Sequence, residues 1–516
     1  MILSPSFLAV ALTVISLGFW FGRRNKRDAN LWMYGTYAGL AFVTWLNYFA
    51  VGALAESIPT IIRDFILIGV VGLVQSMAVA KRISVVTALV LILGLFIVAY
   101  SIPLPAANGV QSTPTTSITT TSDQQTDYPQ AAADGEYLVE KRPDVSEAQL
   151  KDWASIHGIK IRPAFTMDAE DATLLDEYYI LDTKEASSTI QQLIIDSDLT
   201  TWVEMNEVIT VDPLPAKVIP ENKSVYGIND PAANQQWIME ALAMPEYYAL
   251  LSQQKPKKVA KIAILDTGVD ANHEDIKGNY FTTQRKYDND PRGHGTHCAG
   301  IAAAVTNNKV GIASMAGPGK FVEVTSIKVL SGSGMGTQST IIQGILEAAD
   351  SGVDVISLSL GGISSQRRQR AYNQAISYAR RNNAIVLAAA GNSNRQASGY
   401  SPANTAGIIC VSAIDNLLLR APFSNRVQGI KMPIAAPGVG IYSTIPGSKY
   451  ATYSGTSMAC PFVAGLIGVL RSLNPDLNAD EMYDILQKTA QRSREVADVG
   501  PIVQPAAALQ HVVSPQ

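Results

Sequence analysis

Residues 257–270 read KKVAKIAILDTGVD, an apolar run that ends in an aspartate, a threonine and a glycine. The run is continuously apolar rather than alternating, as expected for a strand of a parallel sheet that is covered on both faces. Four later runs have the same character, and helix-like runs alternate with them: FVEVTSIKVL (321–330), DVISLSL (354–360), AIVLAAA (384–390) and GIICVSAI (407–414). Residues 231–516 are therefore predicted to form an α/β domain, a parallel sheet covered by helices.

Three polar side chains stand where such a sheet places its sites, near the carboxyl ends of strands. Asp266 directly follows the first strand, His294 begins the helix-like run HGTHCAGIAAAV, and Ser457 begins another after GT. Each alone has a plain interpretation, since serine and aspartate often cap helices and turns. Together they supply a nucleophile, a base and a carboxylate in the chain order Asp–His–Ser, which favours acyl transfer.

The motifs DTGVD, HGTHCAG, SLSLGG, AAAGN and GTSMACP follow one another as in subtilisin-like serine proteases, and the resemblance spans about residues 226–511. It implies that Asp266 orients the base His294 and that Ser457 is the nucleophile. It also implies that Asn392 donates its side-chain amide to the oxyanion.

The same resemblance implies a substrate cleft. Ser359, Leu360 and Gly361 would line it, and residues 332–336, with Gly334 among them, would pair with a polypeptide substrate as an added strand. The sequence departs from the family's S-P-H after the nucleophile, because Cys460, Pro461 and Phe462 stand there.

The chain has three cysteines, Cys298, Cys410 and Cys460, and each lies in an apolar run. We expect buried free thiols, because three cysteines cannot all pair among themselves. Serine rather than cysteine catalysis follows, since Cys460 lies one helical turn beyond the expected nucleophile.

A structural calcium ion is also implied. AAVTNNKVGIA (303–313) resembles the metal loop of thermitase-like members of the family. The ligands carried over are hard oxygens that suit Ca²⁺: Asp230, Asp275, Val305, Asn308, Val310 and Ile312. The alternative is an Asn-rich surface turn.

The first hundred residues hold four apolar stretches, near 5–21, 31–51, 60–79 and 83–101, each about as long as a membrane span. They lack a polar face, and Trp and Tyr gather near their ends, so residues 1–103 are expected to be four transmembrane helices rather than a buried bundle or a signal peptide. The basic loops after the first and third stretches put both ends outside the cytoplasm. The rest of the chain is then extracytoplasmic, in a periplasm or outside the cell.

Residues 104–135 are rich in Ser, Thr and Pro and are expected to be a disordered linker. Residues 136–213 show the order βαββαβ of a ferredoxin-like domain. This domain resembles the inhibitory prodomain of many subtilases, whose last strand, here WVEMNEVITV (202–211), would lead a tail into the cleft. Residues 214–230 are expected to be an exposed linker that is cut during processing.

The sequence thus predicts a membrane-anchored extracytoplasmic serine endopeptidase, made as a precursor that its own prodomain inhibits. The net charge of −4 gives no indication of a basic surface that would bind nucleic acid. Two alternatives stay open: a membrane sensor or signalling protein with a proteolytic output, for which Arg63 and Asp64 near the third span are the only hints, and a peptide-binding pseudoprotease.

Overall fold

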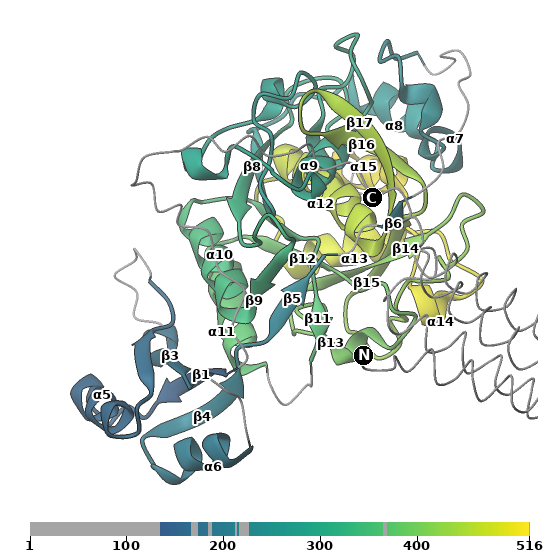
Figure 1. The fold of residues 1–516 in the computed structure, drawn as a ribbon. Coiled ribbons are helices and arrows are strands. Elements are labelled where there is room, and N and C mark those ends of the chain that lie inside the picture. The colour runs from purple at the N-terminus through teal and green to yellow at the C-terminus, as the bar shows by residue number, and fades with distance from the viewer. Residues whose placement is uncertain are drawn as a thin grey trace, which may run out of the picture. The chain divides into compact units, whose positions relative to one another are not determined.

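The computed structural model describes residues 135–166, 174–183, 188–211, 214–215, 227–364 and 369–514 (Figure 1). All of them belong to one compact unit, residues 125–516. The four apolar stretches of residues 1–103 lie outside the described residues, so the prediction that they span a membrane stays a prediction. Within the described part, only α12 (Thr456–Leu473) is long and apolar enough to cross a bilayer, and it is wholly buried.

A six-stranded parallel sheet forms the centre of the larger domain. Its strands run in the spatial order β15-β14-β12-β10-β7-β8. Their bounds are β7 (Ala260–Asp266), β8 (Val322–Lys328), β10 (Val355–Leu358), β12 (Ile385–Ala389), β14 (Ile409–Ile414) and β15 (Pro433–Pro437). Neighbouring residues of one strand face different cores: Ile262 and Ile264 pack with α12, whereas Ala263 and Leu265 pack into the opposite cluster. The predicted α/β domain with a doubly covered parallel sheet is confirmed.

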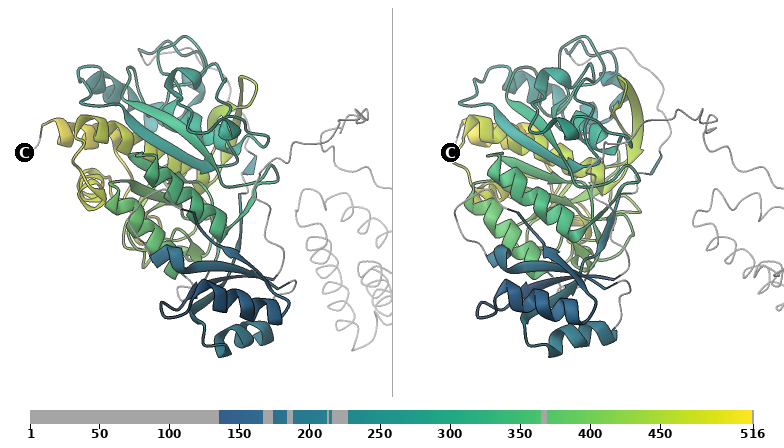
Figure 2. Two further views of the ribbon diagram at one scale, coloured as in Figure 1. Left: turned by 90° about the vertical axis from the view of Figure 1, so that its left-hand side faces the viewer. Right: turned by 60° about the vertical axis from the view of Figure 1, so that its left-hand side comes forward.

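Helices cover both faces of this sheet (Figure 2). On one face lie α8 (Met244–Leu251), α9 (His294–Ala303), α12 and α15 (Pro505–Val513). On the other lie α10 (Gln338–Asp350) and α11 (Arg370–Arg381). The remaining main elements of this domain are α7 (Ile238–Ala241), α13 (Ala479–Thr489), α14 (Val496–Val499), β9 (Met335–Thr337), β11 (Gly362–Ile363), β13 (Tyr400–Ser401), β16 (Ile441–Ile445) and β17 (Lys449–Ser454).

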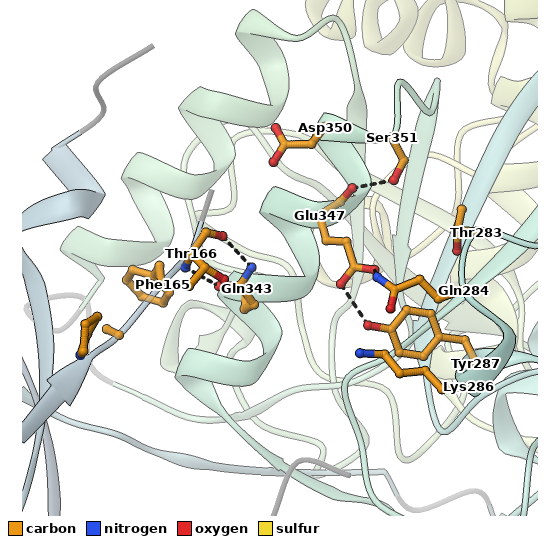
Figure 3. A pocket seen from close by; sticks show the side chains of 12 residues that line it. Phe165, Thr166, Thr283, Gln284, Lys286, Tyr287, Gln343, Glu347, Asp350 and Ser351 are labelled. Atoms are coloured by element: carbon orange, nitrogen blue, oxygen red, sulfur yellow. Dashed lines mark hydrogen bonds between the residues drawn. The ribbon is translucent and has the colours of Figure 1, made fainter. Parts of the chain in front are cut away.

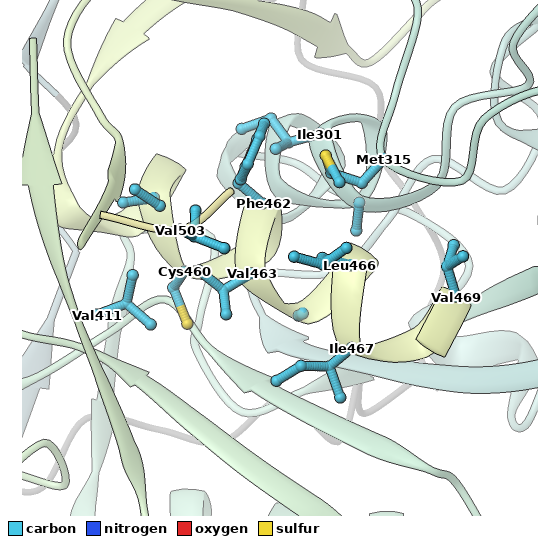
Figure 4. Packing of buried hydrophobic residues seen from close by; sticks show 14 of the residues in the cluster. Ile301, Met315, Val411, Cys460, Phe462, Val463, Leu466, Ile467, Val469 and Val503 are labelled. Atoms are coloured by element: carbon cyan, nitrogen blue, oxygen red, sulfur yellow. The ribbon is translucent and has the colours of Figure 1, made fainter. Parts of the chain in front are cut away.

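The apolar helix α12 packs into the core around its whole circumference (Figure 4). Phe462 lies on the side of Ile301, and Cys460 lies on the side of Val411. All three cysteines are buried and free, as the sequence predicts. The two departures from the family pattern are therefore core residues of α12.

Pro461 lies inside α12 and has no N–H to donate to the carbonyl of Ser457, four residues earlier. That carbonyl instead accepts from Ser359 Oγ at 2.8 Å and from Cys298 Sγ at 3.4 Å. The proline thus frees one carbonyl in the first turns of α12, and side chains from β10's end and from α9 satisfy it. These bonds tie the start of α12 to the elements beside it.

A smaller domain precedes the sheet domain in the chain. Its elements follow in the order β1 (Glu136–Lys141), α5 (Glu147–Ile156), β2 (Lys160–Pro163), β3 (Tyr178–Asp182), α6 (Ser188–Asp196) and β4 (Thr200–Met205). The four strands pair antiparallel in the order β2-β3-β1-β4. One apolar core, with Val139, Leu150 and Leu181 fully buried, lies between this sheet and the helices.

The stretch 202–211 is not the single strand that the sequence suggests. β4 ends at Met205 and pairs with β1, whereas β5 (Val208–Thr210) pairs with β9 of the larger domain. Asn206 separates them: its N–H donates to Glu136 O, and its side-chain oxygen accepts from Ser339 N at the start of α10. The break lets one segment serve two sheets.

Arg471 anchors the far end of α12. Its side chain is only 1% exposed and donates to Asp354 Oδ1 at 3.0 Å and to Asn383 O at 3.0 Å. Asp354 also pairs with Lys258. A buried carboxylate is thus held between two cations.

We expect Arg471→Ala to lower the free energy of unfolding by about 3 kcal/mol. The change removes the buried partner of the Asp354 carboxylate and leaves only the more exposed Lys258. Urea unfolding in a Ser457→Ala background, which prevents self-digestion, measures this. The exposed Arg492, changed to alanine, is the control and should shift stability by less than about 0.5 kcal/mol. Equal effects of the two changes would contradict the assigned role of Arg471.

Candidate active site

Asp266, the last residue of β7, and His294, the first residue of α9, form a fully buried pair. Both carboxylate oxygens of Asp266 lie 2.8 Å from His294 Nδ1. Asp266 Oδ1 also accepts from Thr267 N at 2.7 Å. The carboxylate therefore fixes the imidazole with its proton on Nδ1, which leaves Nε2 as the basic atom.

Asp290 fixes the turn that delivers His294, and sequence reasoning missed it. Its buried carboxylate accepts from the backbone N–H groups of Arg292, Gly293 and Thr296 at 2.8–3.1 Å. It also accepts from the hydroxyls of Thr267 and Thr296, both at 2.8 Å. Asp290 lies three residues before Gly293, the N-cap residue of α9. Its carboxylate accepts from N–H groups at the start of that helix, and so fixes the backbone that carries His294.

Ser457 is the second residue of α12, beside the free N–H groups of that helix's first turn. In this structure its hydroxyl donates to Ser359 O at 3.0 Å. His294 Nε2 has no hydrogen-bond partner among the described residues. The hydroxyl must leave Ser359 O before it can donate to Nε2, so the structure holds the nucleophile and the base in a resting arrangement.

Asn392 lies at the same site with its amide orientation set by Thr456. Its side-chain oxygen accepts from Thr456 N and from Thr456 Oγ1, each at 2.9 Å. A Cβ placed on Gly455 would lie 3.3 Å from Asn392 Nδ2, so the amide nitrogen faces the start of α12. The amide nitrogen of Asn392 therefore lies beside the first residues of α12, a position that agrees with the predicted role of Asn392 as an oxyanion donor.

A cleft of about 550 Å³ adjoins these residues. The predicted residues Leu360 and Gly361 line it together with Asn392 and Ser457. The predicted Ser359 lies beneath it, fully buried, and acts through its hydrogen bonds to Ser457. The predicted Gly334 lies on the opposite side of residues 208–211 from Gly361, and its backbone has a φ of +80°.

The chain's own residues Val208, Thr210 and Val211 also line this cleft. β5 pairs antiparallel with β9, and Thr210 forms an antiparallel bridge with Gly361 on the other side. Val211 N donates to Gly334 O at 3.1 Å. A strand added between two cleft edges is a common way of binding an extended polypeptide.

The sequence profile of the subtilase family matches residues 257–504. Thermitase from Thermoactinomyces vulgaris is 42% identical over 253 residues, which cover 48% of this chain and 86% of thermitase. This chain belongs to the subtilase family. Subtilisin DY from Bacillus licheniformis is 41% identical over 237 residues, 45% of this chain and 83% of that relative. A solved structure described as proteases from Pseudoalteromonas arctica PAMC 21717 aligns with a TM-score of 0.50 at 29% identity, covering 55% of this chain and 99% of its own.

This subtilase is a serine endopeptidase, and we propose that Asp266, His294, Ser457 and Asn392 carry out its reaction in the following steps. His294 Nε2 takes the proton as Ser457 Oγ attacks the substrate carbonyl carbon, and Asp266 stabilises the imidazolium. Asn392 and the backbone N–H at the start of α12 donate to the oxyanion that forms. His294 then protonates the leaving amine, which leaves an acyl group on Ser457, and water releases it by the same steps in reverse order.

Cys298 is the third member of a buried cluster with Asp266 and His294. Burial raises the pKa of its thiol well above the usual value, so the thiol stays protonated. Burial also raises the pKa of the Cys460 thiol, to about 12. Neither sulfur is available as a thiolate nucleophile or metal ligand, which supports catalysis by Ser457.

The Asn392→Ala variant should lose the side-chain donor to the oxyanion and keep the triad. We expect kcat to fall about 10²- to 10³-fold, the loss known for the oxyanion-hole asparagine of subtilisin, with KM little changed. Steady-state hydrolysis of a chromogenic peptide measures both constants. Ser393→Ala, in the same cleft lining, is the matched control. A similar loss of kcat in the two variants would contradict the role of Asn392.

Proposed function

We propose that this subtilase is made as a self-inhibited precursor, in which residues 136–213 act as an inhibitory prodomain that the enzyme itself cuts off. The observation that carries the proposal is β5, which pairs with β9 on one side and with Gly361 on the other, as an added substrate strand would. The small domain, with four antiparallel strands and two helices, supports the ferredoxin-like prodomain reading of the sequence.

The start of α10 is one contact between the small domain and the protease. Gln338 N donates to Glu207 O at 2.8 Å, and Gln338 Nε2 donates to Glu204 Oε1 at 3.0 Å. Asn206 accepts from the next N–H of the helix, that of Ser339. Backbone donors that have no partner inside the helix are thus satisfied by the prodomain.

Two further contacts flank this one. Arg370, the first residue of α11, pairs with Glu140 of β1 at 3.1 Å. Gln343 of α10 binds the backbone of Thr166 in both directions, accepting from its N–H at 2.9 Å and donating to its carbonyl at 2.8 Å (Figure 3). These bonds hold the small domain against α10 and α11, from which its last segment continues into β5.

The processing bond is proposed to be one of the three that join Val211 to Leu214. Val211 binds Gly334 on one side of the cleft, and Leu214 pairs with Ser454, three residues before Ser457. Residues 212–213 lie outside the described residues. The proposed cut is at the amino-terminal edge of the linker 214–230 that the sequence suggests.

Purified wild-type precursor should therefore convert to a product whose N-terminus lies within residues 212–214, while Ser457→Ala precursor stays full length. Mass spectrometry of both, followed over time at several dilutions, tests this, since self-cutting within one molecule is independent of concentration. A Ser457→Ala precursor that is processed at the wild-type rate would sink the proposal. A wild-type N-terminus outside residues 212–214 would contradict the proposed processing bond, and a conversion rate that rises with concentration would indicate cutting between molecules.

We further propose that the precursor is anchored in the cell membrane by residues 1–103, with the protease outside the cytoplasm. The apolar stretches and the basic loops of the sequence support this. Because the prodomain lies between the anchor and the protease in the chain, processing would also cut the covalent tether. A mature protease that still runs with the membrane segment on a denaturing gel would contradict this order of events.

We propose a structural calcium ion at the loop 305–312. Asp230 and Asp275 are fully buried, and neither pairs with a lysine or arginine among the described residues. Burial raises the pKa of Asp275 to about 7. Asn308 joins the two acids: its backbone N–H donates to Asp230, and its amide nitrogen donates to Asp275.

Gly311 shows how closely the backbone of the loop approaches the carboxylate of Asp275. A Cβ there would lie 2.2 Å from Asp275 Oδ2, so only glycine fits. Two uncompensated buried carboxylates favour a hard cation. The residues that would hold it are Asp230, Asp275, Asn308 and the carbonyls of Val305, Val310 and Ile312, after the Asn308 amide turns its oxygen toward the acids.

Calcium at about 100 times its Kd should stabilise the wild-type fold by about 2.7 kcal/mol, because the ion binds only the folded loop. A thermal melt with calcium or with a chelator measures this shift, in the Ser457→Ala background. Asp275→Asn should melt at one temperature in both buffers. An unshifted wild-type melt, or an equal shift in the variant, would argue against a calcium site here.

A further inference from the structure

Arg292 stands beside the cleft, two residues before the catalytic base. Its guanidinium lies over Gly334, because a Cβ on that glycine would come within 2.6 Å of Arg292 Nε. Its Nη2 lies 3.5 Å from the carbonyl oxygen of Val211. Val211 is therefore held on both sides of its main chain, by Gly334 O at its N–H and by Arg292 at its carbonyl.

The charge of Arg292 has no acidic partner among the described residues. The nearest acid in sequence, Asp290, accepts the backbone N–H of Arg292 at 3.1 Å. Its two oxygens accept four further hydrogen bonds, from Thr267, Gly293 and Thr296. Asp290 is thus bonded to the turn before α9, and the guanidinium of Arg292, which lies near Val211 and Gly334, has no carboxylate partner among the described residues.

We propose that Arg292 is a specificity-determining residue, which favours polypeptide substrates with an acidic side chain at the place of Val211 or at the residue that follows it. The proposal rests on the proposed function, because it takes β5 as a stand-in for a substrate strand. A carboxylate near an arginine at the edge of a cleft gains charge-assisted hydrogen bonds, and a lysine there is repelled.

The chain's own tail has the chemistry that such a cation selects. In the sequence, Val211 is followed by Asp212. Val211 itself is buried, and its carbonyl oxygen, not its side chain, is the atom that Arg292 contacts. Because this carbonyl belongs to the bond that joins Val211 to the next residue, both of these substrate positions are tested.

The test uses the full-chain enzyme and two series of internally quenched peptides based on the tail VITV. In one series Glu, Gln or Lys replaces the last valine, and in the other it follows that valine. For wild type we expect kcat/KM to be about tenfold higher with Glu than with Lys in at least one series. A ratio of this size corresponds to the energy of a partly exposed ion pair. The ratio should shrink in 0.5 M salt, because salt screens exposed charges.

Arg292→Gln should bring the Glu-to-Lys ratio close to one, and Arg292→Glu should invert it. Arg395→Gln, a change of an exposed arginine outside the cleft lining, should keep the wild-type ratio. An unchanged ratio in Arg292→Glu, or a wild-type ratio near one in both series, overturns the proposal. The readout uses added peptides, so an enzyme that shows the Arg292-dependent ratio but never cuts its own chain would overturn the self-processing proposal alone.

Discussion

The buried contact between Asp266 and His294 is the interaction on which the site depends. A carboxylate with no exposure is costly unless it is hydrogen-bonded, and here Thr267 and the imidazole supply the bonds. The hydrogen bonds between Asp266 and His294 join the end of β7 to the start of α9. Both elements also belong to the core of the sheet domain. Stability and catalysis therefore draw on the same contact.

The nucleophile depends on a second constraint, which lies in α12. Pro461 removes one helical hydrogen bond, and Ser359 and Cys298 supply substitutes at the freed carbonyl of Ser457. The backbone at Ser457 is thus fixed from three elements while its hydroxyl is free to move from Ser359 O to the base. A rigid backbone with a mobile hydroxyl suits a group that must exchange a proton in each half of the reaction.

Much of this could be predicted from the sequence, because its signals are local. Continuous apolar runs predict buried parallel strands, and the polar residues that end them predict a site, so Asp266, His294 and Ser457 were all identifiable. Asp290 and Arg292 were not, since Asp290 acts through bonds to the start of α9, and Arg292 contacts the carbonyl of Val211, 81 positions earlier in the chain. The break at Asn206 was hidden for the same reason: WVEMNEVITV is apolar enough for one strand, and only the partner sheets divide it.

The most direct measurement of the central claim is covalent labelling of the active protease by a phosphonofluoridate, with the modified residue identified by mass spectrometry. The account predicts one label, on Ser457, and a labelling rate that falls by several orders of magnitude in His294→Ala, because the hydroxyl then has no base. A label on another serine or on Cys298, or an unchanged rate in His294→Ala, would contradict the assignment of the triad.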